Sequence, residues 1–175
     1  MVERKLGDKS IRLVRGDITE VEADAFVYDV TSDCKLGSGY GGAIVARGGK
    51  QVQEELSAHG SCATGDAVVT SGGSLKARHI IHANGPKFLE PDTEPKLRMA
   101  ARAALRKADE LGVARLAFPP LGTGLYQVPL ELCAKVLIEE ADSHLRNGGR
   151  QREIVLVAAD SREFRPFEAQ LKGRS

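Results

Sequence analysis

Strand-like and helix-like segments alternate along almost the whole chain. The short apolar runs typical of strands are 11–14, 25–28, 67–70, 79–82, 115–118 and 154–158, and the segments of helical periodicity are 42–58, 95–111, 129–145 and 164–171. This alternation favours an α/β fold in which helices cover both faces of a mostly parallel or mixed sheet. Ligands bind to such sheets beyond the strand ends, so the loops there are the expected place for a functional site.

The size and charge of the chain limit what it can be. A length of 175 residues is enough to bury one continuous core, which predicts a single domain spanning residues 1–175. Trp is absent and aromatic residues make up 5% of the chain, so Val, Leu, Ile and Ala are expected to fill the core. The formal charge is +1 and charges of both signs are mixed along the chain, which argues against nucleic acid as a partner.

The cysteines and the apolar content indicate where the protein works. Cys34, Cys62 and Cys133 are present without a C-x-x-C pair, so neither a disulfide framework nor a zinc site is encoded. Residues 1–9 are polar and charged, and no stretch approaches the roughly 20 apolar residues that a membrane span requires. These features predict a cytoplasmic protein with no membrane partner.

A glycine-rich segment at 37–42, the first glycine loop, opens a predicted helix. Bare backbone N–H groups at the start of a helix are suited to bind an anion. Gly37, Gly39 and Gly42 also match the G-x-G-x-x-G dinucleotide-binding pattern. In a Rossmann unit the glycines follow the strand directly, whereas a polar stretch separates them here from the strand that ends at Tyr28, which argues against that fold. A flexible surface loop is the alternative.

A second segment of this kind, Gly-Thr-Gly-Leu-Tyr at 122–126, lies between a predicted strand and a predicted helix and is called the second glycine loop. It lacks the Gly-Lys-Ser/Thr of a P-loop, and an ordinary strand-to-helix connection is the alternative. Two such loops in one domain are what a diphosphate held from both sides requires. All three tyrosines, Tyr28, Tyr40 and Tyr126, fall at or beside these loops, where their rings can pack on a sugar or base. For Tyr28, which lies in a strand, core packing is the alternative.

Two polar residues lie at predicted strand ends. Asp17 directly follows a strand, and its carboxylate can accept a hydrogen bond from an exocyclic amine such as that of adenine. An Asx-turn or helix-capping role is the alternative for Asp17. His82 has no neighbouring nucleophile in the sequence and is therefore assigned no catalytic role.

Six motifs of the chain, in this order and spacing, resemble those of the macrodomain family. They are Gly-Asp-Ile-Thr at 16–19, Asp-Ala-Phe-Val at 24–27, Gly-Ala-Ile at 42–44, Gly-Asp-Ala-Val-Val-Thr at 65–70, Ile-His-Ala-Asn-Gly-Pro at 81–86 and Ala-Phe-Pro-Pro-Leu-Gly-Thr-Gly-Leu-Tyr at 117–126. Each motif is weak alone, but together they span nearly the whole chain. The resemblance implies a three-layer α/β/α sandwich with a mixed, mostly parallel central sheet and a cleft that binds ADP-ribose at the strand ends.

The resemblance also assigns residues to parts of the ligand. Asp17 would hold the adenine amine, with Ile18 beside it. The other residues implied to line the cleft are Thr31, Gly39, Tyr40, Gly41 and Gly42 around the first glycine loop, Pro120, Gly122, Thr123, Gly124, Leu125 and Tyr126 in and before the second, and Ala159 and Asp160 near the adenine. Because backbone amides would bind the diphosphate, the resemblance implies no metal and no other cofactor. Ala159 stands where the family often has an aromatic residue, which implies weaker stacking on the base.

The chain departs from hydrolytic members of the family in two places. They carry Asn-Ala-Ala-Asn where residues 28–31 are Tyr-Asp-Val-Thr, so Thr31 replaces the second asparagine with a hydroxyl that lacks the paired donor and acceptor of an amide. The polar position that often follows the glycines corresponds to Gly41. Hydrolase activity is therefore expected to be reduced or absent, with Asp29, Thr31 and Asp33 as the remaining catalytic candidates. Solvated loop charges are the alternative interpretation of the two aspartates.

The sequence thus predicts a protein that binds ADP-ribose or a close derivative, free or linked to a protein as mono-ADP-ribose, between the two glycine loops. An ADP-ribosyl hydrolase or an O-acetyl-ADP-ribose deacetylase is one alternative, because the substrate diphosphate can itself help to orient water. A macrodomain adapted to another nucleotide or to an RNA end is the other.

Overall fold

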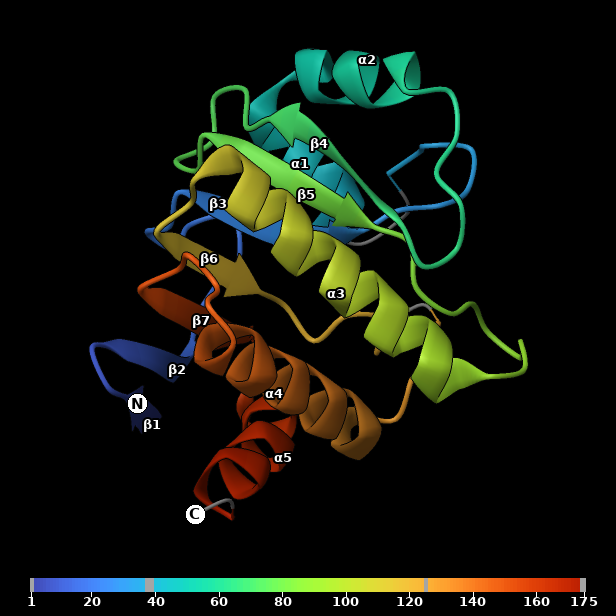
Figure 1. The fold of residues 1–175 in the computed structure, drawn as a ribbon. Coiled ribbons are helices and arrows are strands. Elements are labelled where there is room, and N and C mark those ends of the chain that lie inside the picture. Colours follow the sequence, from blue (N-terminus) through green and yellow to red (C-terminus); the bar gives the residue numbers. More distant parts are fainter. Residues whose placement is uncertain (1, 37–39, 125, 174–175) are drawn as a thin grey trace.

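The computed structural model describes residues 2–36, 40–124 and 126–173, without the side chain of Tyr40. The elements in this part of the chain are β1 (Val2–Leu6), β2 (Lys9–Arg15), β3 (Ala25–Asp29), α1 (Tyr40–Gly48), α2 (Lys50–Ala58), β4 (Ala67–Ser71), β5 (His79–Ala83), α3 (Thr93–Leu111), β6 (Arg115–Phe118), α4 (Leu130–Arg146), β7 (Glu153–Ala158) and α5 (Ser161–Lys172). These strands join in one sheet with the order β1-β2-β7-β6-β3-β5-β4 (Figure 1).

The sheet is mixed and mostly parallel, as predicted. The four inner pairings, β2 with β7, β7 with β6, β6 with β3, and β3 with β5, are parallel. The two outer strands, β1 and β4, each pair antiparallel with their neighbour. Because the inner strands run in one direction, the loops that follow β2, β3, β5, β6 and β7 all leave the sheet at the same edge.

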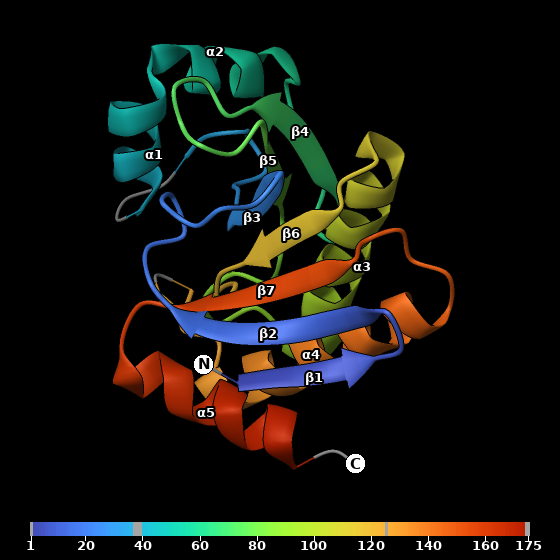
Figure 2. The same cartoon turned by 90° about the vertical axis from the view of Figure 1, so that its left-hand side faces the viewer.

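Helices cover both faces of the sheet, which confirms the three-layer arrangement (Figure 2). α1 and α2 pack on one face, and α3, α4 and α5 pack on the other. Strand β7 shows how the two cores divide, because successive side chains of a strand point to opposite faces. Val155 and Val157 belong to the core under α1 and α2, whereas Ile154 and Leu156 belong to the core under α3, α4 and α5.

The predicted elements are present, with small shifts of their ends. The helical segment 42–58 divides at the Gly48-Gly49 pair into α1 and α2, as that pair predicts. Gly112 ends α3 in the left-handed conformation, with φ 69. Helix α4 begins at Leu130, one residue after Pro129, which serves as its N-cap.

Strand β1 is absent from the sequence prediction, because three of its five residues are charged. Its alternation becomes visible only in the fold, where Arg4 lies between Val2 and Leu6 on the half-buried side. The guanidinium of Arg4 donates to the carboxylate of Asp142 at 3.1 Å and to the carbonyl oxygen of Leu171. A charged side chain therefore occupies an inward position because α4 and α5 supply its acceptors.

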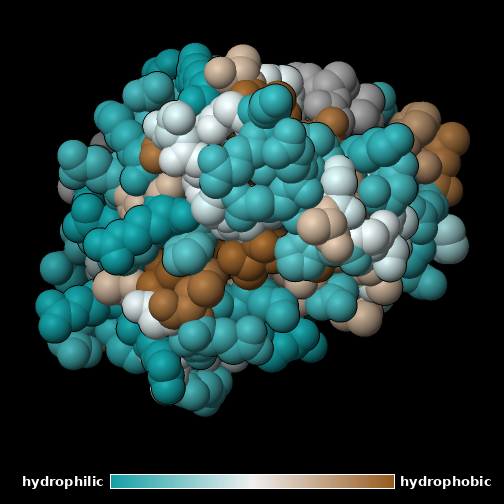
Figure 3. Space-filling view, turned by 90° about the horizontal axis from the view of Figure 1, so that it is seen from above, coloured by the Kyte–Doolittle hydropathy of each residue, from teal (hydrophilic) through white to brown (hydrophobic). Residues whose placement is uncertain are grey.

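Hydrophilic side chains dominate the face seen in Figure 3, where hydrophobic surface is limited to small areas. Within the described residues, the large hydrophobic side chains that stay exposed are Phe88, Leu89 and Met99. No helix in the described ranges is long and apolar enough to cross a membrane.

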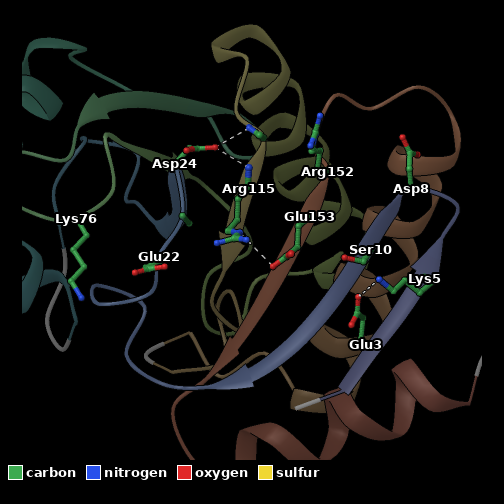
Figure 4. A pocket seen from close by; sticks show the side chains of 12 residues that line it. Glu3, Lys5, Asp8, Ser10, Glu22, Asp24, Lys76, Arg115, Arg152 and Glu153 are labelled. Carbon is green, nitrogen blue, oxygen red and sulfur yellow. Dashed lines mark hydrogen bonds and ion pairs between the residues drawn. The ribbon is translucent and has the colours of Figure 1, made fainter.

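A hollow of about 790 Å³ lies at the amino ends of the parallel strands, on the edge opposite the glycine loops (Figure 4). Charged side chains of both signs line it. Among them, the carboxylate of Asp24 accepts hydrogen bonds from the N–H groups of Ala114 at 3.0 Å and Arg115 at 2.9 Å. Asp24 thereby ties the chain entering β3 to the start of β6, the two strands from which the glycine loops extend.

Replacing Asp24 with Ala is expected to lower the free energy of unfolding by about 3 kcal/mol, since two hydrogen bonds to a charged acceptor, worth about 1.5 kcal/mol each, are lost. Urea denaturation measures the change. Glu22→Ala, which removes an exposed carboxylate from the same hollow, is the matched control and is expected to stay within about 0.5 kcal/mol of the native chain. Equal effects of the two substitutions would contradict the role given to Asp24.

Candidate functional site

The loops that follow β3 and β6 lie side by side. The two strands are parallel neighbours, with Ala25 opposite Leu116, so both loops leave the sheet at its carboxyl edge. The backbone N–H of Gly122 donates to the carboxylate of Asp29 at the end of β3, with the nitrogen and Oδ2 3.2 Å apart. Strands β5 and β4 lie on one side of β3, and β6 and β7 lie on the other. This is the switch point where open α/β sheets bind ligands.

The second glycine loop is held by hydrogen bonds of its own. Gly122 has φ 75, a left-handed conformation that favours glycine, and its carbonyl accepts from the N–H of Val128 at 3.0 Å. The hydroxyl of Thr123 donates to the carbonyl of Pro120 at 2.9 Å. The loop is thus a closed turn ahead of α4, a shape in which backbone N–H groups can converge on an anion.

Two hydrogen bonds with Gln53 of α2 hold the chain segment that precedes the first glycine loop. Gln53 accepts a hydrogen bond from the N–H of Leu36 at 3.1 Å and donates one to the carbonyl of Cys34 at 3.1 Å. Gly41, in the first turn of α1, packs against Leu36, and a Cβ added to it would lie 3.2 Å from the Leu36 carbonyl carbon. This close approach gives a packing reason for a glycine at position 41.

Thr31 and Asp33 form a local turn after β3. The Thr31 hydroxyl donates to the carboxylate of Asp33 and accepts from the N–H of Lys35, the latter at 3.1 Å. The bond from Thr31 holds the pKa of Asp33 below its ordinary value, and the Asp33 side chain is 64% exposed. Asp33 is therefore an ionised carboxylate that faces solvent.

Asp17, at the carboxyl end of β2, already has hydrogen-bond partners. Its Oδ1 accepts from the N–H of Thr19 at 2.9 Å and from the Thr19 hydroxyl at 2.7 Å, which is an Asx-turn arrangement. Its Oδ2 accepts from the guanidinium of Arg47 in α1 at 2.7 Å. Burial raises the pKa of Asp17, but the bonds from Thr19 and Arg47 outweigh burial, so the pKa lies below 3.8. Asp17 is an ionised acceptor with three of about four lone-pair positions filled.

A polar cluster includes the last residue of the second glycine loop, Tyr126, together with the side chains of Asp29, Asn84 and Lys87. Lys87, from the segment between β5 and α3, places its ammonium 4.5 Å from the centre of the Tyr126 ring, a cation–π contact. The same ammonium donates to the carbonyls of Gly85 at 2.9 Å and Val30 at 3.3 Å, and to Oδ1 of Asn84 at 2.5 Å. The cluster therefore connects the ends of β3 and β5 with the second glycine loop.

Burial shifts the acid–base properties of this cluster. Removal from water raises the pKa of Asp29 to about 6, although the Gly122 hydrogen bond and the charge of Lys87 both act to lower it. Burial lowers the pKa of Lys87 against the opposing charges of Asp29 and Glu90. Burial and the nearby aspartates raise the pKa of Tyr126. Asp29 is thus a carboxyl group that titrates near neutral pH beside the second glycine loop.

The predicted base-facing residues lie at the carboxyl end of β7, next to β2. Ala159 is exposed, and its N–H donates to the Glu163 carboxylate at 2.8 Å. Asp160 caps α5 by accepting from the N–H of Glu163 at 2.9 Å. A narrow gap at the neighbouring strand ends has no room for a water molecule and is lined by Leu13, Phe118, Pro120, Leu156, Val157, Ala158 and Phe167. Asp160, a predicted residue of the candidate site, thus also stabilises the start of α5.

The described residues of the predicted site lie along one edge of the sheet. From β2 to β3 they extend over three strand spacings, about 14 Å. Gly42 and Gly124 are exposed, Pro120, Thr123 and Tyr126 are half-buried, and Ile18 is buried. The predictions for Gly39, the Tyr40 side chain and Leu125 lie outside the described residues.

Three polar residues of this edge are missing from the sequence prediction: Arg47, Asn84 and Lys87. Asn84 and Lys87 lie in the segment after the predicted strand 79–82, so the rule that sites form at strand ends points to that segment. Arg47 lies 30 positions from Asp17 in the sequence, and no local pattern signals their contact.

Comparison with known proteins gives matches over most of the chain. A sequence model of the Macro domain family matches residues 29–137. A protein of Pyrobaculum aerophilum is 39% identical over 173 residues, which cover 95% of this chain and 93% of that protein. A macro domain-containing protein of Caldanaerobacter subterraneus is 34% identical over 165 residues, covering 91% of this chain and 94% of the relative.

Solved structures give the same fold. The Oceanobacillus iheyensis macrodomain with ADP superimposes with a TM-score of 0.92 at 23% identity, covering 98% of this chain and 95% of that one. The Trypanosoma brucei macrodomain in complex with ADP-ribose has a TM-score of 0.84 at 28% identity, covering 90% of this chain and 67% of that one. Its fold, its matching family model and its full-length relatives together establish that this chain belongs to the Macro domain family.

Proposed function

We propose that this macrodomain binds ADP-ribose, free or attached to a protein as mono-ADP-ribose, in a cleft between the two glycine loops. The observation that carries the proposal is the 3.2 Å hydrogen bond between Gly122 and Asp29, because it joins the end of β3, from which the chain continues to the first glycine loop, to the loop that follows β6. Backbone amides of two adjacent loops can hold a diphosphate from both sides without a metal. Asp17, further along the same edge, is the acceptor for the adenine amine.

Similar solved proteins support this ligand class. The Trypanosoma brucei macrodomain was solved with ADP-ribose and the Oceanobacillus iheyensis macrodomain with ADP. Both ligands contain adenosine joined to a diphosphate. Such a ligand needs an acceptor for the adenine amine and backbone N–H groups for the diphosphate. Asp17 and the two glycine loops are the candidates for these two roles.

We further propose that hydrolysis by this chain is weak or absent. The Thr31 hydroxyl is engaged by Asp33 and Lys35 in a local turn, which leaves it poorly placed to orient a ribose or a water molecule. Gly41 carries no side chain to position water either. The intact acceptor and loops favour binding, and these two departures from the hydrolytic pattern disfavour catalysis.

Hydrolysis of an ADP-ribosyl bond is the second candidate function, and Asp29 is the observation that favours it. A carboxyl group with a pKa of about 6 is suited to general acid–base chemistry near neutral pH. A time course with a mono-ADP-ribosylated protein decides the matter. Turnover that is lost in Asp29→Asn would support hydrolysis, and release no faster than without the protein would remove it.

Asp17→Ala is expected to weaken ADP-ribose binding about tenfold, because a hydrogen bond to a charged acceptor is lost. Isothermal titration calorimetry measures the affinity. Asp8→Ala, which removes an exposed carboxylate from the opposite edge, is the matched control and is expected to bind as the native chain does. The absence of heat from the native chain at millimolar ADP-ribose, meaning binding weaker than about 4 kcal/mol, would remove the proposed function.

We also infer that residues 1–175 act as one domain in the reducing cytoplasm. Cys34, Cys62 and Cys133 are free thiols and are all buried, which suits a compartment that keeps thiols reduced.

A further inference from the structure

We propose that Asp29 is a built-in competitor of the ligand diphosphate, and that its negative charge makes ADP-ribose binding weaken as pH rises. This inference rests on the proposed function and adds a specificity-determining residue to it. Asp29 stands outside the set of residues that the family resemblance assigns to the ligand.

The competition follows from the contact between Asp29 and the second glycine loop. The Gly122 N–H donates to Oδ2 of Asp29 at 3.2 Å, so a carboxylate already occupies a backbone amide of the loop that is proposed to hold the diphosphate. Carboxylates and phosphates are bound by backbone N–H groups in the same way. One N–H carries one hydrogen, and two anions at the same short loop repel each other in a partly buried setting. An ionised Asp29 therefore opposes the ligand.

Lys87 reduces this repulsion only in part. Its ammonium has three hydrogens, and it donates to the carbonyls of Val30 and Gly85 and to the side-chain oxygen of Asn84. These three contacts hold the ammonium above the Tyr126 ring. Lys87 thus acts on Asp29 through space, and burial outweighs its effect, leaving the pKa of Asp29 at about 6.

The other titratable groups around Asp29 keep their charge state between about pH 5 and about pH 8. Burial raises the pKa of the Tyr126 phenol and of the Cys133 thiol in α4, so both stay neutral. The bond from Thr31 lowers the pKa of Asp33, so that carboxylate stays ionised. Both phosphates of ADP-ribose also stay ionised in this range. Asp29 is therefore the member of this group whose charge changes.

The sign of the pH dependence follows from the direction of the shift. Below its pKa of about 6, Asp29 is neutral and does not repel the diphosphate. As pH rises through that value, Asp29 ionises in the free protein, and the bound diphosphate raises its pKa further. Binding then requires the uptake of a proton, so the affinity falls until Asp29 is ionised in the complex as well.

Calorimetric titration of the full chain with ADP-ribose across this pH range tests the inference. The native chain is expected to bind about tenfold more weakly at about pH 8 than at about pH 5. Asp29→Asn keeps an oxygen that accepts from Gly122 but removes the charge, and it is expected to bind with little pH dependence and more tightly than the native chain at the higher pH. Asp8→Asn, at the opposite edge, is expected to keep the native pH dependence.

A second measurement needs no variant. Titrations of the native chain near neutral pH in buffers of different ionisation enthalpy report the protons taken up on binding, and the inference requires a net uptake. Native binding that is independent of pH, or without proton uptake, would overturn this inference and leave the proposed function standing. Failure of the native chain to bind ADP-ribose at every pH would overturn both.

Discussion

ADP-ribose is expected to bind about a hundredfold more weakly to Gly122→Ala than to the native chain. Gly122 has φ 75, and a Cβ added to it would lie 2.8 Å from Cγ2 of Val128, closer than real side chains approach. The loop must move to relieve this contact, and its N–H groups then point away from the diphosphate. The loss of two charge-assisted hydrogen bonds of about 1.5 kcal/mol each corresponds to this factor.

Gly60→Ala is the matched control for Gly122→Ala. Gly60 also has a positive φ, 80, but an added Cβ there has no atom within 4 Å. Both variants therefore carry backbone strain of about 1 kcal/mol, which thermal unfolding reports, whereas the displacement of the loop occurs in Gly122→Ala alone. Calorimetry that found equal ADP-ribose affinity for the two variants would show that the second glycine loop does not hold the ligand.

Replacement of Glu140 by Ala is expected to lower the free energy of unfolding by about 3 kcal/mol, because two arginines lose their shared carboxylate. Glu140 is buried in α4 and accepts from Nε of Arg102 at 2.7 Å and from Nη1 of Arg98 at 2.9 Å, both in α3. These bonds join two of the three helices that cover one face of the sheet. Urea denaturation at neutral pH measures the change.

Glu139→Ala is the control for Glu140→Ala. Glu139 accepts from the same Arg98 at 2.7 Å, but its side chain is 26% exposed, so its replacement is expected to reduce stability by about 1 kcal/mol or less. Similar losses for the two variants would contradict the dominant role of Glu140.

The contribution of Glu140 is also expected to depend on pH. Burial raises the pKa of Glu140, but the hydrogen bonds from Arg102 and Arg98 outweigh burial and hold the pKa below 4.5. A carboxyl group with a lowered folded-state pKa stabilises the fold above its unfolded-state pKa, and this stability is lost as pH falls through the folded-state value. The difference between the native chain and Glu140→Ala is therefore expected to shrink in acid, and a difference that grew in acid would contradict this account.

Sequence patterns predicted the helices and strands wherever the signal is local. The division of α1 from α2 follows from the Gly48-Gly49 pair, and the end of α3 follows from Gly112, because glycine alters the backbone at its own position. The prediction missed β1, because the inward position of Arg4 depends on acceptors in α4 and α5 that are distant in the sequence.

Only part of the candidate site could be predicted from the sequence. Asp17 and the two glycine loops are visible as residue types at strand ends. The sequence gives no sign that Arg47 occupies one oxygen of Asp17, or that Lys87 lies over the ring of Tyr126. Those contacts depend on how α1 and the segment after β5 pack against the sheet, which no local pattern encodes.

By itself, the sequence determined the alternation of strands and helices, the position of both glycine loops at strand ends and the set of family motifs, because each depends on residues that are close in the chain. Only the tertiary structure decided that Asp29 meets the amide of Gly122. That contact requires β3 and β6 to be neighbours although two strands and three helices separate them in the sequence, and strand order is set by the packing of the whole sheet.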